Sequence, residues 1–171
     1  FAPTRNNLHN TMLAAGRRFA SRTPLVQAAA ICRRANGHTA AEKELVDVNR
    51  ALLKAIGRGD FEAYNALVAE EATCIEPETA GQIVAGNAFH KHYFDLPADP
   101  NAPKVAKLTS MTDINVRVCD AGKLGFLAYN RVTQAGLKTS VAQETRIWEK
   151  RDGRWLQVHF HKSTTNSSFS G

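Results

Sequence analysis

Four long segments in the C-terminal half of the chain constrain its fold most strongly. Each combines β-branched and aromatic residues with a partial alternation of apolar and polar side chains, which is typical of half-buried strands. The turn signals DAGK, AG and RDGR separate them, and such short Gly-containing turns join antiparallel neighbours. The sequence therefore predicts a four-stranded antiparallel meander, with strands at Thr109–Cys119, Leu124–Gln134, Thr139–Lys150 and Trp155–Ser163.

A helical pattern precedes these strands. From Glu42 onward, apolar residues recur at a spacing of three to four, which predicts an amphipathic helix of about four turns; they are Leu45, Val48, Leu52 and Ile56. Gly57 and Gly59 end this pattern, as glycines commonly do at helix C-termini. Helices followed by an antiparallel meander indicate an α+β fold. A curved antiparallel sheet packed round the long N-terminal helix would bury the apolar faces of both.

Shorter elements are expected between the long helix and the meander. Asp60 can cap a second helix, whose apolar face would comprise Phe61, Tyr64, Leu67 and Val68. Asn87 can cap a third helix, which carries Phe89, Tyr93 and Phe94. Between them we expect two short strands and a turn, at Thr73–Glu76, Gln82–Ala85 and Pro77–Gly81. The stretch DLPADPNAP contains three prolines and predicts a loop.

Charge divides the chain into an extension and a domain. Residues 1–39 hold six of the 22 basic residues and no acidic ones, so the rest has 16 basic against 16 acidic residues. We expect a basic N-terminal extension or linker at 1–40, a globular domain at 41–164 and a flexible tail at 165–171. Because the domain is neutral, the high isoelectric point gives no argument for nucleic-acid binding. No apolar run approaches the roughly 18 residues that a membrane span needs.

The cysteine pattern indicates a reducing compartment and gives no support for a zinc or redox site. Cys32, Cys74 and Cys119 are odd in number and far apart, with no zinc or redox spacing. A reducing intracellular setting, the cytoplasm, is the simplest interpretation. A mitochondrial location is the alternative, because residues 12–35 are rich in Arg, contain Ser, lack acids and so resemble a transit peptide.

Six motifs in order along the chain carry a family resemblance. They are GRGDFEAYNAL, CIEPETAGQIVAG, FHKHYF, LAYNRVTQ, QETRIWEKRDGRW and VHFHKS, and they lie within the stretch Glu44–Ser163. As a set, they resemble the association (hub) domain of calcium/calmodulin-dependent protein kinase II, in the nuclear transport factor two-like (NTF2-like) superfamily. The resemblance implies a cone-shaped α+β fold and a homo-oligomeric ring of subunits.

The resemblance also implies that the domain has no catalytic activity of its own. The glycine-rich nucleotide loop and the HRD and DFG motifs of protein kinases do not occur in the sequence. A kinase domain, in cis or in trans, is the implied partner. The N-terminal stretch NTMLAAGRRFAS weakly resembles the end of a calmodulin-binding segment, so calmodulin is a further expected partner of residues 1–39, unless they are a transit peptide or a plain linker.

Three basic residues are expected on inward faces of the meander. Arg131, Arg146 and Lys162 share strand faces with apolar or mixed neighbours, where a charge needs a partner or water. One hypothesis is a basic pocket that binds carboxylates. The alternative is that Glu76, Glu78 or Glu144 pairs with them. The family resemblance favours a pocket, because Tyr64, His90, Arg131, Arg146 and Lys162 match its lining.

Metal binding, cofactor binding and catalysis find less support in the sequence. His90 and His92 would point apart on a helix, whereas His159 and His161 would share a strand face but have no further ligand at suitable spacing. We therefore expect neither a metal nor a cofactor. An isomerase or dehydratase of the same superfamily is the enzymatic alternative, and it would need a carboxylate base such as Glu76 or Glu78 in the pocket.

Overall fold

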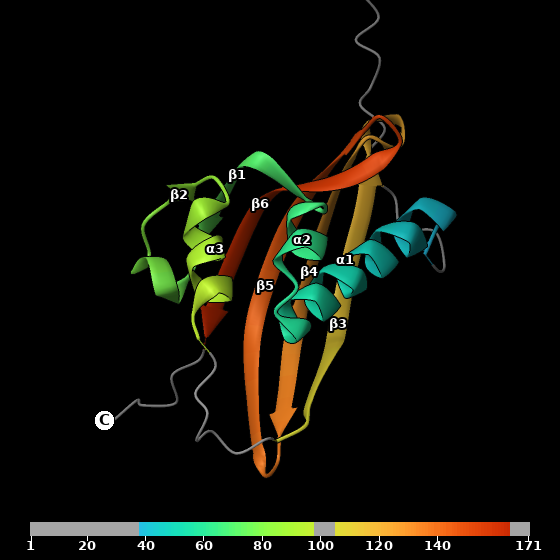
Figure 1. Ribbon diagram of the computed structural model, residues 1–171. Helices are drawn as coiled ribbons and strands as arrows, with labels where there is room; N and C mark the ends of the chain where they lie inside the picture. The colour runs from blue at the N-terminus through green and yellow to red at the C-terminus, as the bar shows by residue number, and fades with distance from the viewer. Residues whose placement is uncertain (1–37, 98–104, 165–171) are drawn as a thin grey trace, which may run out of the picture.

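The computed structural model describes residues 38–97 and 105–164. These residues form three helices and one six-stranded sheet, and α1 lies across the sheet (Figure 1). The expected N-terminal extension, the expected tail and part of the DLPADPNAP loop lie outside the described residues. Among those that are described, no helix has the length and apolarity needed to cross a membrane.

Helix α1 (Ala40–Arg58) confirms the predicted long helix. Its start is fixed by a capping box, in which the Thr39 side chain accepts from the Glu42 amide while the Glu42 carboxylate accepts from the Thr39 amide. It ends at Gly59, which adopts the left-handed conformation with φ 67°. The buried face includes Asn49, a polar residue that the apolar pattern did not assign to it.

Helix α2 (Phe61–Asn65) is shorter than predicted. Asp60 caps it as expected, accepting from the Ala63 amide at 3.0 Å. However, Leu67 and Val68 do not continue its apolar face, because Val68 already begins β1 (Val68–Ile75). The Leu67 carbonyl accepts from the Gln157 amide of β6 at 2.9 Å, so pairing with a distant strand ends the helix.

Two short elements connect β1 to the third helix, α3. A 3-10 turn at Pro77–Thr79 and the short strand β2 (Val84–Ala85) lead into α3 (Ala88–Asp95). Asn87 precedes α3 as predicted, but its side chain makes no capping hydrogen bond to the helix; it donates instead to Asn65 at 2.9 Å.

The C-terminal meander follows the prediction closely. It consists of β3 (Lys107–Cys119), β4 (Leu124–Ala135), β5 (Lys138–Arg151) and β6 (Arg154–Thr164), each antiparallel to the next. The full strand order is β2-β1-β6-β5-β4-β3. Since β1 runs parallel to β6, the sheet is mixed, and the expectation of a wholly antiparallel sheet was wrong at this one pairing.

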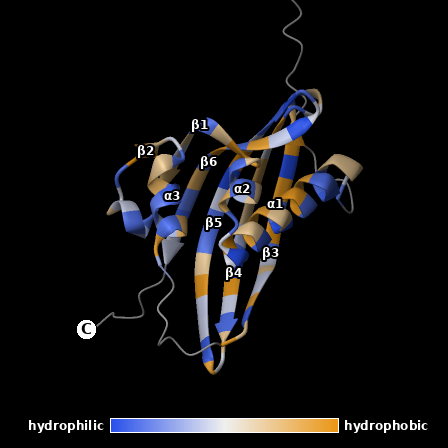
Figure 2. Cartoon of the chain, viewed as in Figure 1, coloured by the Kyte–Doolittle hydropathy of each residue, from blue (hydrophilic) through white to orange (hydrophobic). Residues whose placement is uncertain are grey.

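The core lies between α1 and the sheet. Leu45 and Leu52 of α1 are fully buried against residues of β3 and β4, including Val116 and Leu127. Figure 2 shows apolar and polar residues alternating along these strands, which gives the sheet one apolar face toward the helix. Trp148 and Trp155 are buried in this core as well.

Close approach of α1 to the sheet depends on a glycine in β4. A Cβ placed on Gly125 would lie 2.5 Å from Cδ2 of Leu45 and 3.3 Å from the Arg117 carbonyl oxygen. A side chain at this position would require Leu45 to shift and would crowd the backbone of β3. Gly125 therefore permits the close contact between Leu45 of α1 and β4.

Candidate functional site

A cavity of about 290 Å³ opens between the helices and the sheet. All five residues predicted for the pocket line it: Tyr64 from α2, His90 from α3, Arg131 from β4, Arg146 from β5 and Lys162 from β6. The other walls are three carboxylate or aliphatic side chains and three aromatic ones, namely Glu76, Glu78, Ile56, Tyr93, Phe94 and Phe160. The volume suits a small ligand. That these residues bind one stays a prediction.

Arg146 is the most enclosed of the cations. Its side chain is 1% exposed, and its guanidinium lies 3.9 Å from the centre of the Phe160 ring. Nε donates to the Tyr129 hydroxyl at 3.1 Å, Nη2 to Glu144 at 3.0 Å, and Nη1 to Gln157. Each of the three nitrogens thus has a protein partner, so Arg146 is held by the protein itself.

Arg131 is more available to a ligand. Nη1 lies 3.1 Å from Oε1 of Glu144, and the side chain is 21% exposed. Among the described residues this carboxylate is its one ion-pair partner, and Arg131 also lines the cavity. A guanidinium that is partly exposed in a cavity is suited to bind a carboxylate through two parallel hydrogen bonds.

Glu144 joins the two arginines. Burial alone would raise the pKa of its carboxyl, but the charges of Arg146 and Arg131 and the hydrogen bond from Tyr129 hold the pKa below its usual range. The carboxylate is therefore ionised at neutral pH. Two guanidinium groups share one buried negative charge, which leaves an excess positive charge at this wall of the cavity.

Lys162 pairs with two other carboxylates, Glu76 and Glu78. Its Nζ lies 2.6 Å from Glu78 and 3.2 Å from Glu76, and its side chain is 9% exposed. The alternative that Glu76, Glu78 or Glu144 pairs with the basic residues therefore describes Lys162 and Arg146 well, and Arg131 in part. In and around the cavity, three basic side chains therefore pair with three carboxylates; they are Arg131, Arg146 and Lys162 with Glu144, Glu76 and Glu78.

His90 connects Tyr64 to Glu76. Its Nδ1 lies 3.0 Å from the Tyr64 hydroxyl and its Nε2 lies 2.8 Å from Glu76. Burial raises the pKa of the Tyr64 hydroxyl to about 12, so it stays protonated. Although burial acts in the opposite direction, the hydrogen bond from His90 and the charge of Lys162 lower the pKa of Glu76 to about 2.

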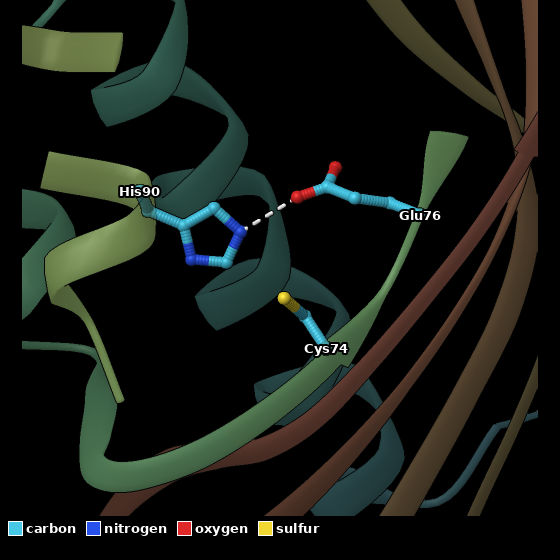
Figure 3. A group of neighbouring side chains, drawn as sticks. All are labelled: Cys74, Glu76 and His90. Atoms are coloured by element: carbon cyan, nitrogen blue, oxygen red, sulfur yellow. Dashed lines mark hydrogen bonds and ion pairs between the residues drawn. The ribbon is translucent and has the colours of Figure 1, made fainter. Parts of the chain in front are cut away.

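Two residues of the site were not found by sequence analysis. Gln157 contacts Arg146 because the register of β6 shifts between the pairs Trp148–Gln157 and Ile147–His159. Cys74 lies under the cavity wall beside Glu76 and His90, and the three side chains point toward one another (Figure 3). Burial, followed by the charge of Glu76, raises the pKa of the Cys74 thiol to about 11.

The comparison with protein families points to one family. The family model described as calcium/calmodulin dependent protein kinase II association domain matches residues 41–166. The delta subunit of calcium/calmodulin-dependent protein kinase type II from Oryctolagus cuniculus is 36% identical over 129 residues, which is 72% of this chain and 24% of that protein. The chain thus spans about a quarter of the length of such relatives.

Solved structures give the same result for the fold. The calcium/calmodulin-dependent protein kinase II hub homology domain from Chlamydomonas reinhardtii superposes with a TM-score of 0.68 at 38% identity, covering 74% of this chain and 98% of that one. An NTF2-like protein of unknown function from Pseudomonas putida superposes with a TM-score of 0.58 at 16% identity, covering 74% and 87%. At that identity, the likeness shows the fold alone, which is the NTF2-like fold.

Proposed function

Since the chain belongs to the calcium/calmodulin-dependent protein kinase II association domain family, we propose that it is a non-catalytic hub that assembles with copies of itself into a closed ring. The observation that carries the proposal is the extent of the match, because residues 41–166 comprise nearly all of the described fold. We assign the hub to residues 41–164. The mass of the intact assembly tests the proposal.

An exposed apolar patch supports self-association. Leu124 and Phe126 of β4 are 41% and 39% exposed, and Ile147 lies opposite Phe126 on β5. These residues alternate with Gly125 and Leu127, which face α1, so the patch occupies the other face of the sheet. Adjacent exposed apolar side chains on the face of a sheet are typical of a surface that a partner covers.

The state of the pocket carboxylates supports a non-catalytic role. A general base works best when its pKa lies near the working pH. With a pKa of about 2 and partners in both His90 and Lys162, Glu76 is a weak base. Glu78 is engaged by Lys162 at 2.6 Å. Neither residue is poised to abstract a proton as an isomerase or dehydratase would require.

The pocket is proposed to bind small carboxylates, with Arg131 as the primary contact. What supports this is that Arg131 lines the cavity, is 21% exposed and has a single ion-pair partner among the described residues. Arg146 and Gln157 would hold Glu144 and Arg131 in place, while Tyr64, His90 and Lys162 form the wall. The apolar side chains of Ile56, Phe94 and Phe160 would receive the hydrocarbon part of the ligand.

Partners and compartment are further proposals. A kinase domain, in cis or in trans, would be gathered by the ring. Residues 1–39 would bind calmodulin, direct the chain to mitochondria or serve as a linker. If they do not act as a mitochondrial targeting segment, the expected location is the cytoplasm. Calcium-dependent retention of the chain on immobilised calmodulin would support the first role. Import and cleavage by isolated mitochondria would support the second.

A further inference from the structure

Three potential metal ligands converge beside the pocket. Cys74 lies near the end of β1, Glu76 follows that strand, and His90 comes from α3. A sulfur, a carboxylate oxygen and a ring nitrogen from these residues all lie within 4.8 Å of one another (Figure 3). Among the described residues, this is the one group of three or more such side chains close enough to hold an ion.

The donor set and its spacing fit zinc. Zinc takes thiolate, imidazole and carboxylate ligands at about 2.0–2.3 Å in a tetrahedral arrangement, which places neighbouring ligand atoms about 3.3–3.7 Å apart. His90 Nε2 and Glu76 Oε1 are already 2.8 Å apart. The three ligand atoms lie within 4.8 Å of one another, which exceeds the tetrahedral spacing by about 1 Å. Side-chain rotations that move these atoms by about 1 Å would therefore bring all three to ligand distance from one ion.

Tyr64 holds the imidazole in the orientation that a metal ligand needs. Its hydroxyl lies 3.0 Å from Nδ1, so it can accept a hydrogen bond from the Nδ1–H tautomer of His90. That tautomer differs from the one in which Nε2 donates to Glu76; in it, Nε2 offers a lone pair on the side of Glu76 and Cys74. A metal-ligating histidine generally has such a partner on its other ring nitrogen, which fixes the tautomer and the ring plane.

The surrounding charges allow a dication to bind. Glu76 now pairs with Lys162 at 3.2 Å, but Lys162 keeps a shorter contact of 2.6 Å with Glu78. Glu76 can therefore turn to a metal without leaving the ammonium group unpaired. A thiolate and one carboxylate then neutralise the two charges of the ion, and Cys74 and Glu76 are only 2% and 6% exposed.

We propose that Cys74, Glu76 and His90 bind a thiophilic divalent cation, zinc in the first place, with a coordination position left open on the pocket side. On binding, the Cys74 thiol releases its proton to solvent. The imidazole keeps its proton on Nδ1, which donates a hydrogen bond to the Tyr64 oxygen. Thiolate coordination selects zinc over magnesium and calcium, which take oxygen ligands. The ion would add a Lewis-acid contact to the charged wall formed by Arg131.

Cobalt(II) is the probe, because it replaces zinc in tetrahedral sites and reports thiolate ligation by a near-ultraviolet charge-transfer band. Chelator-treated full-length chain is titrated with cobalt. We expect one equivalent per subunit, a thiolate band, and displacement by zinc. Cys74→Ala should lose the band, whereas Cys32→Ala/Cys119→Ala, which removes both other cysteines of the sequence, should keep it.

His90→Gln provides a second test, in case the loss of Cys74 impairs folding. It should retain the thiolate but weaken cobalt binding at least about tenfold, since it removes one of three protein ligands. No thiolate band in the wild type, a band that survives Cys74→Ala, or unchanged affinity in His90→Gln would each overturn the proposal. Carboxylate binding and assembly are measured separately with chelator present, so their failure is distinguishable from failure of the metal site.

Discussion

Glu144 and Arg146, two residues apart on one face of β5, form an ion pair of 3.0 Å inside the molecule, with side chains 0% and 1% exposed. Arg131 adds a second guanidinium at 3.1 Å from the other carboxylate oxygen. The Glu144 carboxylate is thus the shared counter-ion of both guanidinium groups beside the pocket. Breaking a buried pair by removing one partner leaves an uncompensated charge, which costs more than the pair contributes.

Glu144→Gln is therefore expected to destabilise the chain strongly. The amide keeps the shape of the side chain but not its charge, so Arg146 remains buried without a counter-ion. We expect the free energy of unfolding to fall by about 3–5 kcal/mol, measured by urea denaturation at one fixed subunit concentration. Glu149→Gln is the matched control, because Glu149 is 43% exposed in its pair with Arg151; its cost should stay below about 1 kcal/mol. Equal effects of the two variants would contradict this account.

Stability should fall in acid partly through Glu144. Its pKa is lower in the folded chain than in the unfolded one, so the unfolded state binds more protons as the pH drops. The contribution is complete above the unfolded pKa of about 4.3 and is lost as the pH falls through the folded value. Urea denaturation between pH 7 and pH 3 should show a steeper decline for the wild type than for Glu144→Gln; parallel curves would refute the assignment.

Arg131 and Arg146 should differ in their effects on ligand binding. Arg131→Ala should weaken binding of a short carboxylate such as hexanoate by about 10- to 100-fold, the loss expected for a charge-assisted hydrogen bond, with little change in melting temperature. Arg146→Ala should weaken binding too, but should also destabilise the fold because it leaves Glu144 and Gln157 without their buried partner. Lys54→Ala, on α1, is the control and should leave binding unchanged.

Calorimetry of hexanoate binding and thermal unfolding distinguish these outcomes. Higher salt should weaken the binding, although less than at an open surface, because the pocket is partly screened from water. If the wild type does not bind hexanoate and both arginine variants are destabilised, the guanidinium groups serve only internal ion pairs.

Gly125→Ala tests the close contact of α1 with the sheet. The added methyl group would meet Leu45 Cδ2 at 2.5 Å, so overpacking should cost about 1–3 kcal/mol. Gly57→Ala, in the last turn of α1, meets nothing within 4 Å and should be neutral or stabilising by up to about 1 kcal/mol. Thermal unfolding of both variants checks the contrast, and a neutral Gly125→Ala would show that the helix moves away freely.

The sequence specified the elements whose signals are local. The four strands of the meander, the long helix and its end at Gly59 were all predicted, because turn glycines and apolar spacing act over a few residues. Helix α2 was overextended because the event that ends it, pairing of Leu67 with Gln157, joins residues about ninety positions apart. The parallel pairing of β1 with β6 was missed for the same reason.

For the pocket, too, the residues with local sequence signals were predicted and those placed by distant pairings were missed. Alternation along each strand placed Arg131 and Arg146 on inward faces, and the family resemblance added Tyr64 and His90. Gln157 was missed because a register shift in β6 brings it beside Arg146. Cys74 was missed because it gains its neighbours only when β1 and α3 pack together. The spacing of two residues between Cys74 in β1 and Glu76 directly after it was the available signal, but it did not indicate the third ligand.

Phe126→Asp tests the surface proposed for assembly. A charge in the apolar patch of Leu124, Phe126 and Ile147 should break subunit contacts while the 39% exposed position tolerates it in the fold. We expect smaller assemblies with an unchanged circular-dichroism spectrum. Leu137→Asp, at a fully exposed position in the turn between β4 and β5, should leave the assembly intact. Equal loss of assembly in both variants would argue against the patch.

The mass of the intact assembly tests the central claim most directly. Native mass spectrometry of the purified chain at micromolar concentration should show one closed species of many subunits, because a ring satisfies every subunit interface and an open array does not. The subunit mass of 18.7 kDa makes each stoichiometry readily distinguishable. A spectrum with only monomers or dimers would contradict the proposal that this chain is an assembly hub.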